Sequence, residues 1–172
     1  MGAQTQISIA EYLHTAYRPD REYVDGEVRE RNVGKWEHAR IQWLLASWFA
    51  SHESEWGVMG STEQRLQVTA TSVRIPDLVI VESGPQPDVL INPPLLVIEI
   101  LSPDDTYSGL EDRVHDYQTM GVRNIWLIDP IDRIGRTRAN DAWSTATMRL
   151  MVENSPIHVD LNDIFKFLDR PR

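Results

Sequence analysis

Two acidic residues stand beside or inside apolar runs, where a charge is costly. Glu99 is the one charged residue between positions 95 and 101, and Asp77 follows Pro76 directly before the apolar run 78–81. Short apolar runs of this kind predict strands that are covered on both faces, in the middle of a sheet. Because an ion removed from water loses several kcal/mol of solvation, Glu99 needs a cation, a metal ion or a proton as its partner.

A divalent cation shared by the two carboxylates would meet that need. Mg²⁺ binds through one or two protein carboxylates, together with water and substrate phosphate. Such a cation activates water and stabilises the leaving oxygen of a phosphoester. This hypothesis requires Asp77 and Glu99 to meet in the interior of one sheet. The alternative is that Asp77 only begins a strand and that Glu99 pairs with an arginine.

Composition favours one domain with a sizeable core and limits the classes of partner. The chain has 172 residues, a formal net charge of −9 and no cysteine, and its 17 basic residues include two lysines, Lys35 and Lys166. The acidic balance argues against tight, non-specific DNA binding, but it is compatible with an acidic site that takes up metal before phosphate. The chain shows no apolar run of the ~18 residues that a membrane span needs and no secretory signal. Together with the lack of cysteine, this predicts a cytoplasmic protein without membrane association.

Local patterning of the first hundred residues alternates helical and extended segments. Asp25-Gly26 between alternating residues is typical of a hairpin turn. His38 falls at the edge of the apolar stripe of a long helix, where a histidine is more often a packed residue than a catalyst. In chain order we expect a helix at 8–14, a hairpin at 21–30, a helix at 36–52, a turn at 57–60, and strands at 63–68, 77–82 and 95–101.

The remainder of the chain predicts a helix that leads into a further strand. The capping box from Ser108 to Glu111 starts this helix, and Gly121 ends it. Arg113 lies at the edge of the buried helix face, where its stem could simply cover apolar surface. The next strand is expected to run parallel to the Glu99 strand. We expect the helix at 109–120, that strand at 124–130, a hairpin of 134–139 with 146–152, a strand at 157–159 and a helix at 161–168.

Several common catalytic motifs are missing from the sequence. It contains no Gly-rich phosphate loop with lysine, no dinucleotide fingerprint after a strand and no serine in a nucleophile-elbow pattern. Its five histidines never occur at the paired spacing of zinc ligands. Acidic metal chemistry is therefore what remains, unless the chain performs no chemistry.

The order of elements and motifs resembles the Uma-type putative restriction endonuclease family of the PD-(D/E)XK nuclease superfamily. The resemblance covers nearly the whole chain and implies an α/β (α+β) fold: a restriction-endonuclease-like core, a mixed central sheet flanked by helices, and added N-terminal and C-terminal hairpins. It is consistent with one domain over 1–172, composed of a helix and hairpin at 8–33, a core at 36–130 and a C-terminal hairpin and helix at 131–172. The matching segments are 21–28, His38 with Ile41, 74–79, 97–103, Tyr117 with 121–122, 125–130 and 161–165.

This resemblance implies a metal-dependent endonuclease that hydrolyses phosphodiester bonds of DNA, or less readily of RNA. Asp77 and Glu99 would hold Mg²⁺ or Mn²⁺, and Glu27 of the hairpin would be a further acidic member of the site. Analogy with other nucleases of this fold implies a homodimer that presents two sites to a duplex.

The chain departs from the family pattern at the basic residue. The superfamily lysine usually stands two positions after the second carboxylate, where this chain has Leu101. Related sequences carry the lysine on the following helix, at the position of Arg113. Arginine keeps the positive charge and can contact a phosphate through two N–H groups, but it does not readily lose a proton. Two alternatives therefore stay open: a catalytically inactive nuclease-fold protein that serves in binding or as a scaffold, and an unrelated metal-dependent hydrolase of small phosphoesters.

Overall fold

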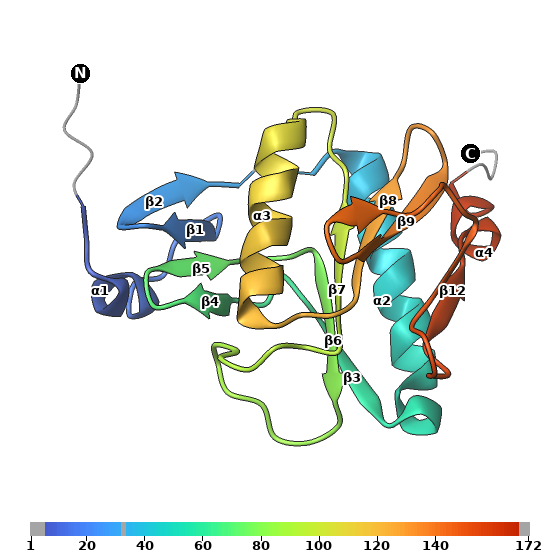
Figure 1. Cartoon of the computed structure of the whole chain (residues 1–172), viewed down its shortest axis with the longest axis horizontal. Coiled ribbons are helices and arrows are strands. Elements are labelled where there is room, and N and C mark those ends of the chain that lie inside the picture. Colours follow the sequence, from blue (N-terminus) through green and yellow to red (C-terminus); the bar gives the residue numbers. More distant parts are fainter. Residues whose placement is uncertain (1–5, 32–33, 169–172) are drawn as a thin grey trace.

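A six-stranded mixed sheet forms the centre of the molecule (Figure 1). A computed structural model describes residues 6–31 and 34–168. Within this sheet only β7 and β8 pair in parallel, as the sequence predicts for the Glu99 strand and the strand after it. The strands lie in the order β10 (Ala142–Trp143), β9 (Ile134–Ala139), β8 (Ile125–Asp129), β7 (Leu96–Ile100), β6 (Leu78–Glu82) and β3 (Val58–Thr62).

Two helices cover opposite faces of this sheet. Residues of α2 (Trp36–Trp56) pack with one set of alternate strand residues, among them Ile98, and residues of α3 (Tyr107–Met120) pack with the other set, among them Val97. Figure 1 shows α3 in front of the sheet and α2 behind it. The central strands are therefore buried on both faces, which explains their nearly continuous apolar sequence. Among the described helices, none is both long and apolar enough to cross a membrane.

A second, antiparallel sheet extends from the N-terminal side of the core. Its strands lie in the order β2 (Glu27–Glu30), β1 (Arg21–Val24), β5 (Ser72–Arg74) and β4 (Leu66–Thr69), and α1 (Ile9–Leu13) lies beside them. The predicted hairpin is present, with Asp25 at φ 48° and Gly26 at φ 93°. Ser8 caps α1 as expected, because its Oγ accepts a hydrogen bond from the Glu11 N–H at 3.1 Å. This sheet brings the hairpin next to the segment that leads into β6.

The C-terminal part differs from the predicted hairpin. β9 turns at Asn140 and pairs with the short β10, whereas β11 (Arg149–Met151) pairs with β12 (His158–Asp160). The segment before β11 contacts β9 through hydrogen bonds between Ser144 and Thr137 and through a bridge between Gly135 and Thr147. A short helix, α4 (Leu161–Phe165), ends the described chain and packs on the α2 side. The sequence placed strands correctly here but assigned the wrong partner to 146–152.

Two boundaries in the middle of the chain were also wrong. The expected turn at 57–60 is mostly strand β3, and α2 continues to Trp56 before Gly57 ends it in the left-handed region at φ 67°. β3 shows little apolar alternation because it lies at the edge of the sheet and is held mainly by backbone pairing with β6. Such a strand leaves a weak signal in the sequence.

The start of α3 lies two residues before the predicted site. Thr106 is the N-cap, and its Oγ1 accepts a hydrogen bond from the Gly109 N–H at 3.1 Å. Ser108, which the capping-box pattern had suggested, already lies within the first turn. This earlier start determines where Arg113 projects from the helix.

Replacing Thr106 by alanine should therefore lower the free energy of unfolding by about 1 kcal/mol, because the cap hydrogen bond is lost. The matched change Ser108→Ala should alter it by less than about 0.5 kcal/mol. Urea denaturation followed by circular dichroism measures both values. A larger loss for Ser108→Ala than for Thr106→Ala would contradict this assignment of the cap.

Candidate active site

Asp77 and Glu99 line the same cavity, which has a volume of about 110 Å³. Antiparallel pairing of β6 with β7 places Leu78 opposite Ile98, so that the next step of the register brings Asp77 beside Glu99. The cavity is lined by Glu22, Glu30, Arg31, His38, Ile75, Asp77, Glu99, Ile100, Ser102, Asp105 and Arg113. The predicted meeting of the two carboxylates is thus a feature of the structure, and Arg113 joins them.

The Asp77 carboxylate is held by two elements at once. Its Oδ2 accepts a hydrogen bond from the Ile100 N–H of β7 at 2.7 Å and lies 3.2 Å from Nε2 of His38 on α2. Its Oδ1 lies 3.6 Å from a guanidinium nitrogen of Arg31. The Gln42 side chain also donates to the Asp77 carbonyl oxygen at 2.9 Å. These contacts hold Asp77 in place. Only 5% of the residue is exposed.

His38 is set apart from an ordinary core histidine by its charged surroundings. Burial lowers its pKa, but the hydrogen bond and charge of Asp77, followed by the charges of Glu99 and Asp105, outweigh burial and raise the pKa above its usual value. His38 is a packed, hydrogen-bonded residue, as the sequence predicts. The structure adds that its partner is the acidic residue at the centre of the site.

Glu99 is almost fully buried, with 5% of the residue exposed. The Tyr117 hydroxyl donates to its Oε1 at 2.5 Å, and Nε of Arg113 lies 3.5 Å from its Oε2. Burial, together with the nearby charge of Asp77, raises the pKa of Glu99 to about 7, against the lowering effects of Arg113 and of the Tyr117 hydrogen bond. In the metal-free protein this carboxyl therefore titrates near neutral pH.

Arg113 projects from α3 into the same cavity. Burial lowers its pKa, but the charges of Glu99, Tyr117 and Asp105 outweigh that effect and raise it, so that the side chain stays positively charged. One guanidinium nitrogen lies 3.2 Å from Oδ1 of Asp105, and Oδ2 of Asp105 accepts the Ser102 N–H at 2.8 Å. Arg113 therefore does more than cover apolar surface with its stem, because its head is directed at the acidic residues.

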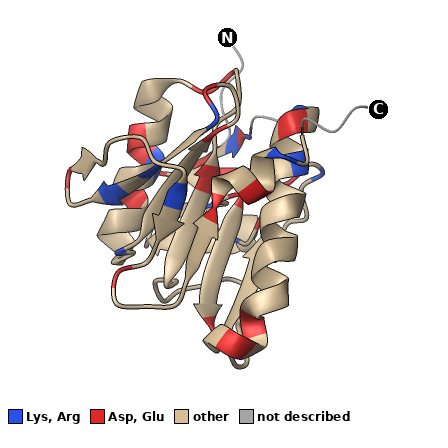
Figure 2. Ribbon diagram, turned by 90° about the vertical axis from the view of Figure 1, so that its right-hand side faces the viewer, with Lys and Arg blue, Asp and Glu red and all other residues tan. Residues whose placement is uncertain are grey.

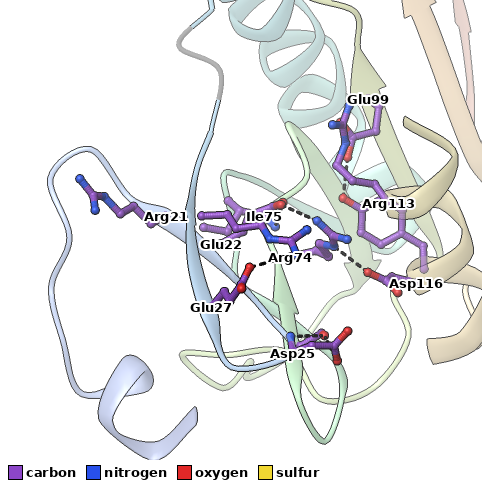
Figure 3. Close-up of polar contacts among 12 residues, drawn as sticks. Arg21, Glu22, Asp25, Glu27, Arg74, Ile75, Glu99, Arg113 and Asp116 are labelled. Carbon is purple, nitrogen blue, oxygen red and sulfur yellow. Dashed lines mark hydrogen bonds and ion pairs between the residues drawn. The ribbon is translucent and has the colours of Figure 1, made fainter. Parts of the chain in front are cut away.

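A buried ion network fixes the approach to Asp77 from the second sheet (Figure 3). Arg74 lies 2.8 Å from Oε2 of Glu22 and 2.7 Å from Oδ2 of Asp116 on α3. The other Glu22 oxygen accepts the Ile75 N–H at 3.0 Å. Since Ile75 is two residues before Asp77, this network links β1, β5 and α3 at the edge of the cavity.

Glu27, the fourth predicted site residue, is not among the residues that line the cavity. Its carboxylate lies 3.3 Å from a guanidinium nitrogen of Arg29, and in Figure 3 it lies toward the Asp25 turn, away from Glu99. From the same hairpin the cavity receives Glu22 and Glu30 instead. The alternation of buried and exposed residues along a strand does not show which of these glutamates faces the cavity, because three successive residues of β1 are buried.

Sequence reasoning also missed Arg31 and gave no role to Tyr117 beyond packing. Tyr117 was recognisable only as a member of the apolar stripe of α3, since its hydroxyl contact with Glu99 is set by tertiary packing. Arg31 follows directly after β2 and reaches Asp77 across 46 positions of sequence. No local pattern could have revealed that contact.

The donor set suits a hard cation that keeps most of its water. Asp77 and Glu99 supply carboxylate oxygens, while no group of three or more metal-binding side chains occurs within 6–31 and 34–168. The Ser102 hydroxyl at the cavity wall is buried and has no hydrogen-bond partner among the described residues. A bound water or ligand would satisfy it. One or two carboxylates plus water match the coordination that Mg²⁺ adopts, rather than a cage of protein ligands.

The chain is similar to proteins described as putative nucleases. A family model described as Uma2, putative restriction endonuclease, matches residues 9–136. A putative nuclease belonging to DUF820 from Anabaena variabilis ATCC 29413 has a crystal structure that matches with a TM-score of 0.79 at 21% identity, over 94% of this chain and 99% of that chain. This structural match identifies the restriction-endonuclease-like fold that the sequence predicts.

A more distant match is a DrdV–DNA complex, with a TM-score of 0.41 at 20% identity, over 76% of this chain and 10% of that chain. A match at this level carries no argument about the site. No curated protein matches the chain.

Replacing Arg74 by methionine should lower the free energy of unfolding by roughly 3–5 kcal/mol, because it leaves Glu22 and Asp116 buried without their common cation. Arg21→Met is the matched control, since it removes an exposed partner of Glu30 and should cost less than about 1 kcal/mol. Chemical denaturation of both variants measures the difference. Equal losses would show that the buried network does not stabilise the fold.

Glu99→Gln should change how stability depends on pH in the metal-free protein. The folded pKa of about 7 lies above the ordinary value of 4.5, so the folded state keeps a proton that the unfolded chain releases between these values. That contribution to stability is present at low pH and is lost as the pH rises through 7. Glutamine cannot ionise, so the variant should gain stability relative to wild type from pH 5 to pH 8. A difference that stays constant over this range would contradict the assignment.

Proposed function

Since the chain belongs to the Uma2 family of putative restriction endonucleases, whose model matches residues 9–136, we propose that it is a metal-dependent endonuclease that hydrolyses phosphodiester bonds of DNA. One observation carries the proposal. Two buried carboxylates from adjacent strands, Asp77 and Glu99, meet in one cavity beside the guanidinium of Arg113. Acidic side chains are seldom buried together without a cation to compensate them, and a site for such a cation is a functional site.

Each residue of the cavity has a distinct role in this proposal. Asp77 and Glu99 would hold Mg²⁺ or Mn²⁺, which when bound lowers the pKa of water and stabilises charge on the scissile phosphate. His38 and the Ile100 N–H occupy Oδ2 of Asp77 and thereby direct Oδ1 toward the cavity. Tyr117 orients Glu99 through its hydroxyl.

Arg113 would contact the phosphate in place of the usual lysine. Its guanidinium carries a permanent charge and can donate two parallel hydrogen bonds to phosphate oxygens. It cannot act as a proton acceptor, so its contribution would be electrostatic stabilisation of the developing negative charge. Arg31 brings a second guanidinium to the opposite carboxylate, Asp77.

A catalytically inactive binding or scaffold protein is the second candidate, and one observation favours it. Both oxygens of Glu99 already have partners, Tyr117 and Arg113, so this carboxylate is compensated within the chain. If Arg113 binds Glu99 more tightly than a metal ion does, the fold would persist without the chemistry. The homodimer and the cytoplasmic location that the sequence suggests stay predictions.

An Mn²⁺-dependent cleavage assay on plasmid and single-stranded DNA tests the proposal. Wild type should cleave at least one of the two, and Asp77→Ala and Glu99→Gln should each lower the rate by at least about 100-fold, because a direct metal ligand matters more than the outer contacts whose loss costs 10–100-fold. The matched change Glu27→Gln should leave the rate within about threefold, since Glu27 lies outside the cavity.

The variant Arg113→Lys separates the two candidates. An inactive wild type that gains cleavage with Arg113→Lys would identify a nuclease that has lost its activity, as the second candidate requires. Equal loss in Glu27→Gln and Glu99→Gln would contradict the assignment of the site.

A further inference from the structure

Two largely apolar clefts adjoin the catalytic cavity, and neither has a role in the proposed hydrolysis. The first has a volume of about 220 Å³ and is lined chiefly by Trp36, Leu101, Pro103, Pro130 and Ile131. It shares His38 with the catalytic cavity. This cleft therefore lies next to the cavity that contains Asp77 and Glu99.

The second cleft, of about 420 Å³, contains Tyr107, Leu110 and Trp143, shares Asp105 with the catalytic cavity and shares Leu101 with the first cleft. Leu101 occupies the position at which the resemblance to the nuclease superfamily implies a lysine. The substitution thus replaces a phosphate contact by an apolar wall common to both clefts.

Large aromatic surfaces stand open beside these clefts. Trp36 is 75% exposed and Tyr107 is 74% exposed, and each is the first residue of its helix. By contrast, Asp77 and Glu99 at the bottom of the catalytic cavity are each 5% exposed. The protein therefore combines a buried acidic cavity with exposed aromatic rings in the two clefts beside it.

We propose that the Trp36 cleft binds an unpaired nucleobase and that the substrate of this site is single-stranded DNA, an inference that rests on the proposed nuclease function. Bases of an unpaired strand can turn outward and stack on aromatic rings, and every base offers such a face. In a duplex the bases are paired and stacked inside, so they could reach this ring only after extrusion. An unpaired strand can place its phosphate at the recessed carboxylates and its base against Trp36 at the same time.

Charge favours base stacking over phosphate binding as the source of affinity. The chain carries a net charge of −9, and in the view of Figure 2 the Lys and Arg positions are interspersed with Asp and Glu positions. Binding that depends on neutralising many phosphates needs a basic surface, which this distribution does not supply. Cations do occur at the clefts. Lys35, whose Nζ lies 3.8 Å from Oδ2 of Asp104, lines the Trp36 cleft together with Glu37, and Arg136 lines the cleft of Trp143. These positions suit one or two phosphates that flank a stacked base.

Binding of a fluorescein-labelled 12-nucleotide single strand in Mg²⁺, measured by fluorescence polarisation on the Glu99→Gln protein to prevent cleavage, tests the proposal. The single strand should bind at least about tenfold more tightly than the duplex of the same sequence, and Trp36→Ala should weaken it by about tenfold, as expected for one stacked base. Trp36→Phe should restore most of the affinity because it keeps an aromatic face.

The matched control is Trp43→Ala. Trp43 lies two turns further along the same helix and is 58% exposed, but it lines neither cleft and instead has Arg40 over its ring at 4.8 Å. This variant should bind like its parent. A strand with abasic sites keeps the phosphates and removes the bases, so its binding should be weak and indifferent to Trp36→Ala.

Three outcomes would overturn the proposal. The first is duplex binding as tight as that of the single strand, and the second is an equal effect of Trp36→Ala and Trp43→Ala. The third is a change in the molecular mass of the protein in solution with Trp36→Ala while DNA affinity is unaltered, which would make the cleft a contact between two copies of the chain. These outcomes are separable from failure of the nuclease function. Absence of cleavage with preserved Trp36-dependent binding would refute the nuclease and leave the cleft, whereas cleavage without that dependence would refute the cleft and leave the nuclease.

Discussion

The cost of burying the Glu99 carboxylate governs the organisation of this molecule. β7 lies in the middle of the sheet with helices on both faces, so the side chain cannot reach bulk water. The fold compensates it with one hydroxyl from Tyr117 and one guanidinium from Arg113, both carried by α3. This compensation is incomplete, because burial still raises the pKa of Glu99 to about 7. A carboxyl in this condition is stabilised by an additional positive charge, which is the physical reason that the proposed function places a divalent cation here.

The same constraint explains why the second sheet is attached where it is. Asp77 faces Glu99 because the segment before β6 is fixed in position, both by burial of Val73 and Ile75 and by polar contacts. Arg74 and Glu22 hold it by joining β5, β1 and the backbone of Ile75. Asp116 extends the network to α3, so the helix that bears Arg113 and the hairpin that bears Glu22 are positioned together. The cavity is thus assembled from elements of both sheets.

The sequence predicted most of this architecture where a single local rule decides the structure. The apolar runs around Asp77 and Glu99 form strands, Asp25-Gly26 forms the hairpin turn, and Gly121 ends α3 at φ 104°. The approach of the two carboxylates also followed from sequence, because short apolar strands close in the chain tend to become neighbours in a sheet.

The predictions failed where tertiary contacts choose between equivalent local patterns. Glu22 and Glu27 both lie in the hairpin, and only pairing with β5 decides that Glu22 reaches the cavity. β3 carries weak periodicity because pairing with β6 at the edge of the sheet, rather than burial, stabilises it.

The basic residue of the site, Arg113, lies on α3 rather than just after Glu99 at the end of β7, and this affects the shape of the site. A lysine two residues after Glu99 would extend a charged head beside the first cleft, whereas Leu101 makes that wall apolar. Arg113 instead reaches Glu99 from α3 and is kept in place by Asp105. Arg113 therefore places its positive charge beside the buried carboxylates, while the two adjoining clefts are lined largely by aromatic and aliphatic side chains. In the proposed function, a phosphate held at Arg113 would lie beside the apolar surfaces of these two clefts, which suit a nucleobase better than a second phosphate.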